Sequence, residues 1–197
     1  MDLTLANILD LVRFTLQNPR EGARAVMGLG LPVGARWWAL LLMAVASTLL
    51  THVSLAMLPA EQRAMLAGVI DSPLRTAVLQ AVVMVGIVLA TYWIGRMRGG
   101  SGSLPDAVIV IAWLQFILLC LQGVQVAAQV LLPVLADIIG IVGLVAFLWL
   151  LTNFVAELHG FRSFWLVLVG VVASMMTLGF AAALLILVLF GGPVAGV

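Results

Sequence analysis

Hydrophobic and polar positions along this chain form long alternating blocks. Five apolar blocks contain no acidic residue and no arginine, and they cover residues 37–58, 76–94, 107–132, 138–156 and 164–190. A helix needs roughly 20 apolar residues to cross a hydrocarbon core about 30 Å thick. The pattern therefore predicts an all-α polytopic integral membrane protein. Its main domain is a bundle of five transmembrane helices over residues 37–190, followed by a short external tail at 191–197.

Polar and helix-breaking residues between the blocks predict where helices begin and end. The sequence Ser103-Leu104-Pro105-Asp106 fits a capping box at the start of the third span, and Asn18-Pro19 and Ser72-Pro73 follow the same logic. Pro133 divides the third apolar block from the fourth, so these two spans are expected to form a tight hairpin. A short helix within 59–70 is expected to turn Met65, Leu66 and Val69 toward the membrane.

The segment before the first span, residues 1–36, has a different periodicity. Apolar residues recur there at helical spacing, with polar residues on the opposite side: Leu5, Ile8, Leu9, Val12 and Leu16 against Asp10, Arg13 and Gln17. Such a pattern predicts an N-terminal amphipathic interfacial helix that lies in the headgroup region. The alternative is a docking helix for a cytoplasmic partner. The acidic residues of this segment argue against a cleavable signal peptide.

The arginines that flank the spans predict the topology. With the N-terminus in the cytoplasm, the cytoplasmic segments hold seven arginines and the external segments hold two: Arg13, Arg20, Arg24, Arg36, Arg96, Arg98 and Arg162 against Arg63 and Arg75. This bias obeys the positive-inside rule. We therefore expect a cytoplasmic N-terminus and an external C-terminus.

Composition excludes several classes of function. Hydrophobic residues make up 64% of the chain and charged residues 9%, which is too few charges to cover a water-facing surface. The formal net charge is +1, and this balance argues against a nucleic-acid partner, which would need a clustered basic face. The single cysteine, Cys120, lies inside an apolar block and indicates neither an intrachain disulfide nor a zinc site. No cofactor or metal is expected.

Four glutamines are the most informative polar residues inside a predicted span. They share one face of the third span and are Gln115, Gln122, Gln125 and Gln129. An unpaired amide that faces lipid would cost several kcal/mol, so this face is expected to point into the bundle or a wet cavity. The stripe has two interpretations: hydrogen bonds between helices, or a polar lining for a permeant or a lipid headgroup.

A second polar group lies at the predicted cytoplasmic end of the fourth span and consists of Asn153, Glu157, His159 and Arg162. Asn153 and Glu157 are one helical turn apart. A Glu-x-His pair could relay protons, but two ligands are too few for zinc. The alternative is a solvated helix end. Further arginines are candidate headgroup contacts: Arg20, Arg24, Arg36, Arg96 and Arg98.

Two stretches of the sequence resemble the Yip family, the Rab-GTPase-interacting membrane proteins and their bacterial relatives. They are Gly99-Gly100-Ser101-Gly102-Ser103-Leu104-Pro105-Asp106 and the run from Phe147-Leu148-Trp149 to Glu157-Leu158-His159-Gly160-Phe161. The resemblance covers roughly residues 25–190 and includes the tight hairpin and the five-span order. It implies a non-enzymatic membrane factor, and a bacterial-type member would lie in the inner (cytoplasmic) membrane with its C-terminus in the periplasm. The chain departs from the eukaryotic relatives in its short N-terminal region and in having Ala112-Trp113 where those proteins have a tyrosine motif, which argues against a GTPase partner.

Three classes of function remain. The first is a non-enzymatic scaffold or accessory subunit that binds another membrane protein, a second copy of itself or lipid. The second is a small transporter or channel that uses the glutamine face of the third span. The third is an intramembrane enzyme that uses Glu157 and His159, and the sequence contains no catalytic motif that supports it.

Overall fold

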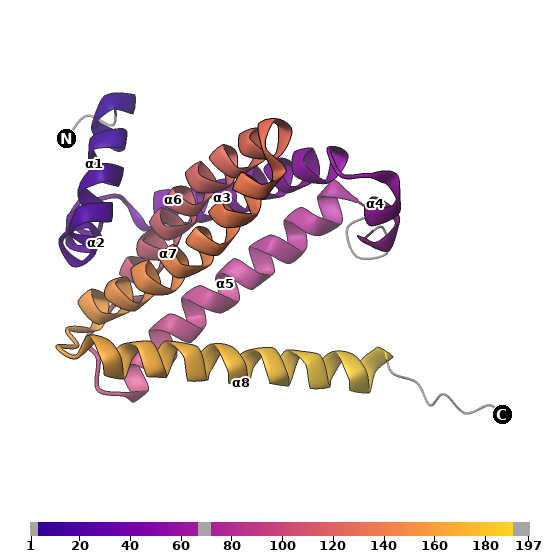
Figure 1. The fold of residues 1–197 in the computed structure, drawn as a ribbon. Coiled ribbons are helices and arrows are strands. Elements are labelled where there is room, and N and C mark those ends of the chain that lie inside the picture. The colour runs from indigo at the N-terminus through magenta and orange to yellow at the C-terminus, as the bar shows by residue number, and fades with distance from the viewer. Residues whose placement is uncertain (1–3, 67–71, 191–197) are drawn as a thin grey trace.

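The computed structural model describes residues 4–66 and 72–190, and every regular element in these residues is a helix (Figure 1). The elements are α1 (Leu5–Gln17), α2 (Pro19–Met27), α3 (Val33–Ala56), α4 (Ala60–Leu66), α5 (Pro73–Met97), α6 (Leu104–Leu131), α7 (Pro133–His159) and α8 (Phe164–Phe190). Five of them, α3 and α5 to α8, are long and apolar enough to cross a membrane. The predicted all-α, five-span fold class is confirmed, and each predicted span overlaps one of these helices.

Helix α6 lies at the centre of the bundle, with α3, α5 and α7 packed around it. Its first turns, Ala107–Ala112, are buried on every face. A helix that is apolar all round can be covered only by neighbouring helices or lipid, and here the neighbours cover it. Side chains from three helices complete this core: Leu40 and Ala44 of α3, Met84 and Val88 of α5, and Leu150 and Phe154 of α7.

The five long helices run alternately up and down, so the start of α3, the end of α5, the start of α6, the end of α7 and the start of α8 share one end of the bundle (Figure 1). We call this the arginine-rich end, because its segments carry Arg20, Arg24, Arg36, Arg96, Arg98 and Arg162.

Local chemistry explains several of the helix ends. The predicted capping box is confirmed: the Ser103 hydroxyl accepts a hydrogen bond from the Asp106 amide at 3.2 Å. Asn18 and Ser72 also stand at N-cap positions, but neither side chain makes a capping hydrogen bond, so that part of the prediction is wrong. Proline at the first helical turn is enough to start α2 and α5 there, because it has the required φ and no amide to satisfy.

The predicted hairpin between the third and fourth spans is present. Helix α6 ends at Leu131, and α7 begins at Pro133 after a single non-helical residue, Leu132. Proline cannot donate to the preceding turn, so the backbone reverses where one continuous helix would have been too long for the bilayer.

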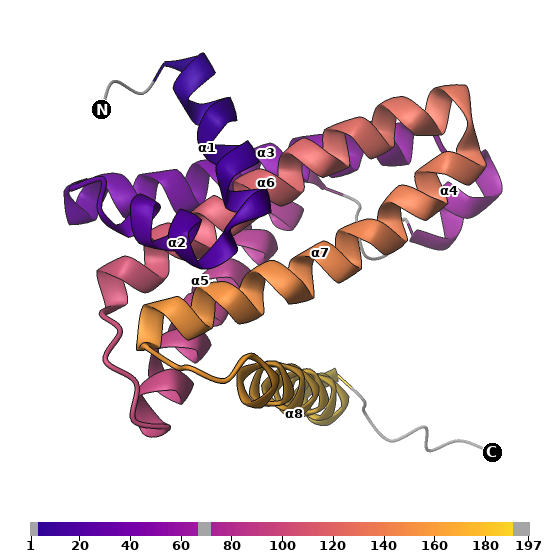
Figure 2. The ribbon, with the colours of Figure 1, turned by 60° about the vertical axis from the view of Figure 1, so that its left-hand side comes forward.

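The N-terminal segment forms two helices that are arranged as a hairpin beside the bundle (Figure 2). Gly22 of α2 lies directly against Thr15 of α1, and the Trp113 indole of α6 donates a hydrogen bond to the Thr15 hydroxyl at 3.1 Å. Helix α2 packs on α7 and α6, whereas α1 leaves Leu9 and Leu16 exposed. Those exposed leucines belong to the predicted interfacial face of α1.

A short helix within 59–70 and an external tail at 191–197 are also predicted from the sequence. The short helix expected within 59–70 is α4, which covers Ala60–Leu66. Residues 67–71, including Val69, and the tail 191–197 lie outside the described residues.

Helix α8 packs against α7 and then runs away from the other helices at an angle (Figures 1 and 2).

Candidate functional site

Three of the four glutamines of α6 hydrogen-bond to hydroxyl groups on α3. The pairs are Gln115 Nε2 donating to Ser47 Oγ at 3.2 Å, Gln122 Nε2 donating to Thr51 Oγ1 at 3.3 Å, and Ser54 Oγ donating to Gln129 Oε1 at 2.9 Å. The hydroxyls recur at spacings of four and three residues, which places them on the α3 face opposite the glutamines. The hydroxyl residues of the first span and the glutamines of the third span thus follow matching helical spacings. This match predicts that the two spans pack together, and it is overlooked when the glutamines alone are considered.

The fourth glutamine, Gln125, reaches the other neighbour of α6. Its amide Nε2 donates to the Ala136 carbonyl of α7 at 3.1 Å. Gly140 of α7 provides the space, because a Cβ there would lie 2.9 Å from Gln125 Nε2. The glutamine stripe therefore links α6 to α3 and to α7, and each contact of this kind is worth about 0.6 kcal/mol in a membrane bundle.

Two arginines of α2 hold it against the last turns of α7. Arg20 donates from Nε to Asn153 Oδ1 at 3.4 Å and from its terminal nitrogens to the backbone carbonyls of Phe161 and Arg162 at 3.3 and 3.4 Å. Arg24 Nε pairs with Glu157 Oε1 at 2.7 Å, and the bonded carboxylate raises the pKa of Arg24 above its ordinary value. Arg20 and Arg24 are four residues apart on α2, and their partners Asn153 and Glu157 are four residues apart on α7. The two contacts therefore align along one face of each helix.

His159, the last residue of α7, is almost completely buried, at 3% exposure. Its Nδ1 accepts a hydrogen bond from the Gly102 amide at 3.3 Å, and its Nε2 lies 3.0 Å from the Thr91 carbonyl of α5. This pair of partners fits the neutral tautomer with the proton on Nε2, because one nitrogen must accept and the other must donate. The ring also stacks on Phe161, with centroids 5.5 Å apart.

Three glycines make room for the His159 ring. A Cβ would lie 2.1 Å from the ring at Gly95, 2.4 Å at Gly100 and 2.8 Å from the adjacent Leu158 at Gly102. Gly160 then ends α7 in the left-handed conformation with φ of 72°. The ring of His159 thus joins the end of α5, the loop 98–103 and the end of α7.

The predicted polar group of α7 is therefore divided between two sets of contacts. Asn153 and Glu157 face α2, whereas His159 faces α5 and the loop, so the structure does not bring Glu157 and His159 together. Arg162 takes part through its backbone carbonyl. Among the described residues, no three His, Cys, Asp or Glu side chains gather as a metal site.

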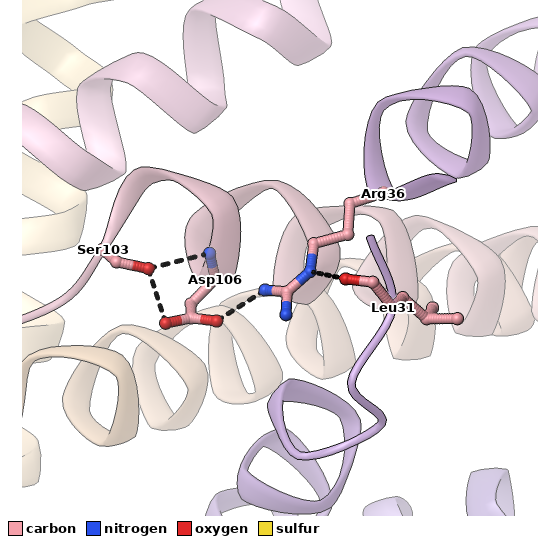
Figure 3. Close-up of polar contacts among 4 residues, drawn as sticks. All are labelled: Leu31, Arg36, Ser103 and Asp106. Carbon is pink, nitrogen blue, oxygen red and sulfur yellow. Dashed lines mark hydrogen bonds and ion pairs between the residues drawn. The ribbon is translucent and has the colours of Figure 1, made fainter. Parts of the chain in front are cut away.

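An ion pair joins the starts of α3 and α6 (Figure 3). Arg36 Nη1 lies 2.6 Å from Asp106 Oδ1, and Arg36 Nε donates to the Leu31 carbonyl at 3.0 Å. The second Asp106 oxygen accepts from the Ser103 hydroxyl at 2.5 Å. The Arg36 side chain is only 12% exposed, so the pair is largely shielded from water.

The five arginines predicted to contact headgroups lie in different surroundings. Arg20, Arg24 and Arg36 are bound to protein partners, while Arg96 and Arg98 are exposed at the end of α5. A headgroup role stays a prediction for all five. The protein contacts of Arg20 and Arg36 compete with a headgroup role most directly, because they use three nitrogens of Arg20 and two of Arg36.

The Arg24–Glu157 pair is expected to stabilise the protein only weakly. The Arg24 side chain is 69% exposed, so water screens the pair, and R24Q or E157Q is expected to lower the unfolding temperature much less than R36Q does. Thermal unfolding of both variants in detergent tests this. A loss equal to that of R36Q would contradict it.

The two sequence stretches that resemble the Yip family contact each other in the structure. His159 of the second stretch sits against Gly100 and Gly102 of the first, and the Ser101 amide donates to the His159 carbonyl at 3.4 Å. The model of the Yip1 domain family matches residues 14–192 of the chain. No curated protein and no solved structure matches it. The match extends over most of the 197 residues, and the chain belongs to the Yip1 domain family of membrane proteins.

Proposed function

We propose that this Yip1 domain protein is a non-enzymatic scaffold or accessory subunit that holds another membrane protein or a lipid against its helices. One observation carries the proposal: the polar side chains inside the described bundle are hydrogen-bonded to other parts of the same chain. The glutamines pair with α3 and α7, His159 pairs with α5 and the loop, and Glu157 pairs with Arg24. What these helices offer to other molecules is chiefly their outer surface.

The alternative, a small transporter or channel, needs amides of α6 that are free to bind a solute. The Gln122 and Gln125 amides already donate to Thr51 and to the Ala136 carbonyl. If the chain transported a solute, Q122L/Q125L would abolish flux in reconstituted vesicles while the fold persisted. For a scaffold, we expect no flux in the wild type and no loss of partner in this variant.

An enzymatic role for Glu157 and His159 makes a different prediction. Since these residues hold helices together, E157Q is expected to retain cellular function, and H159A is expected to lower function only as far as it lowers the amount of folded protein. Function lost at normal protein levels would favour catalysis.

Copurification from native membranes in a mild detergent, followed by mass spectrometry, tests the scaffold directly. We expect a second membrane protein, a second copy of the chain or bound lipid to accompany the full-length protein. Recovery of bare monomer only, from membranes in which the protein acts, would overturn the proposal.

We place the protein in the inner membrane with its N-terminus in the cytoplasm. The gathering of six arginines at one end of the bundle supports this orientation, because positively charged segments are retained on the cytoplasmic side. A C-terminal reporter that is active only in the periplasm is expected to give signal, and one active only in the cytoplasm is expected to stay silent.

A further inference from the structure

Helix α8 leaves a long cleft between itself and α5. The cleft has a volume of about 760 Å³, and its walls come from α5, α7 and α8. Along α5 it extends from Val83 to Arg98, and along α8 it extends to Gly179. At 1.5 Å per residue, fifteen residues of α5 give a length of about 22 Å. Figure 1 shows that the end of α5 and the start of α8 share the arginine-rich end and that the two helices diverge away from it.

The walls of the cleft are apolar over most of this length. Ile87 and Ala90 line it from α5, Val155 from α7, and Leu166 and Val171 from α8. Such a surface suits hydrocarbon and offers few partners to a polar ligand. The length exceeds the depth of one bilayer leaflet, which is about 15 Å, or half of the hydrocarbon core.

The end of the cleft at the arginine-rich end of the bundle carries positive charge. Arg98, at the end of α5, and Arg162, in the α7–α8 loop, both line it, together with Ser163. Both arginine side chains are exposed, and the ion pairs found among residues 4–66 and 72–190 involve other arginines. Two such cations at the mouth of an apolar cleft are complementary to a molecule with an anionic head and a hydrocarbon tail.

The size and charge of the cleft suit a single lipid. Its volume of about 760 Å³ lies within the range of about 300–1,000 Å³ that is typical of small-molecule sites. The two arginines favour an anionic lipid over an apolar protein helix, because the lipid brings a phosphate that can pair with them.

From the charge, the apolar walls and the volume, we infer that the α5–α8 cleft binds an anionic phospholipid, with its phosphate on Arg98 and Arg162 and an acyl chain between the two helices. The inference rests on the proposed function and specifies the lipid part of it. It assigns to Arg98 the headgroup role expected from the sequence and adds Arg162, while Arg96 lies outside the cleft.

Native mass spectrometry of the full-length protein in detergent tests the inference, with phosphatidylglycerol and phosphatidylcholine of identical acyl chains as probes. The wild type is expected to retain phosphatidylglycerol preferentially. Each arginine near a phosphate is expected to contribute about fivefold to affinity, so R98Q/R162Q should lower phosphatidylglycerol binding on the order of 30-fold. The control R13Q/R96Q removes the same charge from exposed positions outside the cleft and should change binding less than about twofold.

A second pair of variants tests the place of the acyl chain. Gly170 lines the cleft, and Gly123 of α6 does not, yet a Cβ at either position meets no atom within 4 Å. G170F is therefore expected to fill the cleft and to reduce binding of both lipids, while G123F leaves binding unchanged.

Equal binding of the two lipids by the wild type, equal effects of R98Q/R162Q and R13Q/R96Q, or full binding by G170F would each overturn the inference. A protein partner that still copurifies with R98Q/R162Q would show that the scaffold function survives without the lipid. Loss of lipid preference and failure of the scaffold proposal are thus separate results.

Discussion

Replacing Gly95 by alanine is expected to destabilise the protein by about 3 kcal/mol, although alanine is the better helix former. The new Cβ would lie 2.1 Å from Nε2 of His159, and the ring cannot retreat because Gly100 and Gly102 already lie against its other side. Moving the ring would also break its hydrogen bonds to the Gly102 amide and the Thr91 carbonyl, which leaves buried polar groups unpaired. Thermal unfolding in detergent, followed by size-exclusion chromatography, measures the loss.

The control for this substitution is G86A on the same helix. A Cβ at Gly86 meets no atom within 4 Å, so the change is expected to stay within about 0.5 kcal/mol. The variant G95A/H159A removes the ring that the new methyl group strikes. Its loss should be smaller than the sum of the two single losses by at least about 1 kcal/mol. Strict additivity of G95A and H159A would mean that the contact does not exist.

The second large effect is expected at Arg36, where R36Q should cost about 2 kcal/mol. The Arg36 side chain is 12% exposed and that of Asp106 is 33% exposed. The expected loss of stability therefore lies between the losses typical of exposed and of fully buried ion pairs. R36K keeps the charge but loses the planar fork that reaches Asp106 and the Leu31 carbonyl together, so an intermediate loss is expected.

The charge-swapped variant R36D/D106R provides the internal test of this pair. It is expected to recover part of the stability that R36D alone loses, as measured by unfolding temperature in the same detergent. R24Q provides the comparison with an exposed pair, because the Arg24 side chain is 69% exposed. If R36Q were no more harmful than R24Q, shielding from water would not be the reason for the strength of the Arg36–Asp106 contact.

Much of the fold could be predicted because the bilayer imposes simple requirements on a sequence. Each spanning helix needs a long apolar block, and each helix end needs a breaker or a cap, as Pro133 and Ser103 provide. The partners of the polar residues could not be predicted in the same way. Arg20 lies 133 positions from Asn153, and nothing local in either segment indicates that contact.

In the candidate site, too, some features could be predicted from the sequence and the partners of the polar residues could not. The glutamine face of α6 was visible in the sequence, and hydrogen bonds between helices were one of its two interpretations, but the hydroxyls of Ser47, Thr51 and Ser54 that bind it lie on another helix. Glu157 and His159 are close in sequence and suggested shared chemistry. Side chains that are two positions apart on a helix point to different faces. Glu157 therefore contacts α2, whereas His159 contacts α5.

The sequence by itself determined the all-α class, the five apolar helices long enough to span a membrane, the tight α6–α7 hairpin and the family resemblance, because these depend on local composition and on short motifs. Only the tertiary structure decided that α2 is held to α7 by two arginines, that His159 fills a space made by three glycines, and that α8 diverges to leave a cleft beside α5. These features depend on which helix faces meet in space, and residues far apart in the chain meet only when the whole bundle has packed.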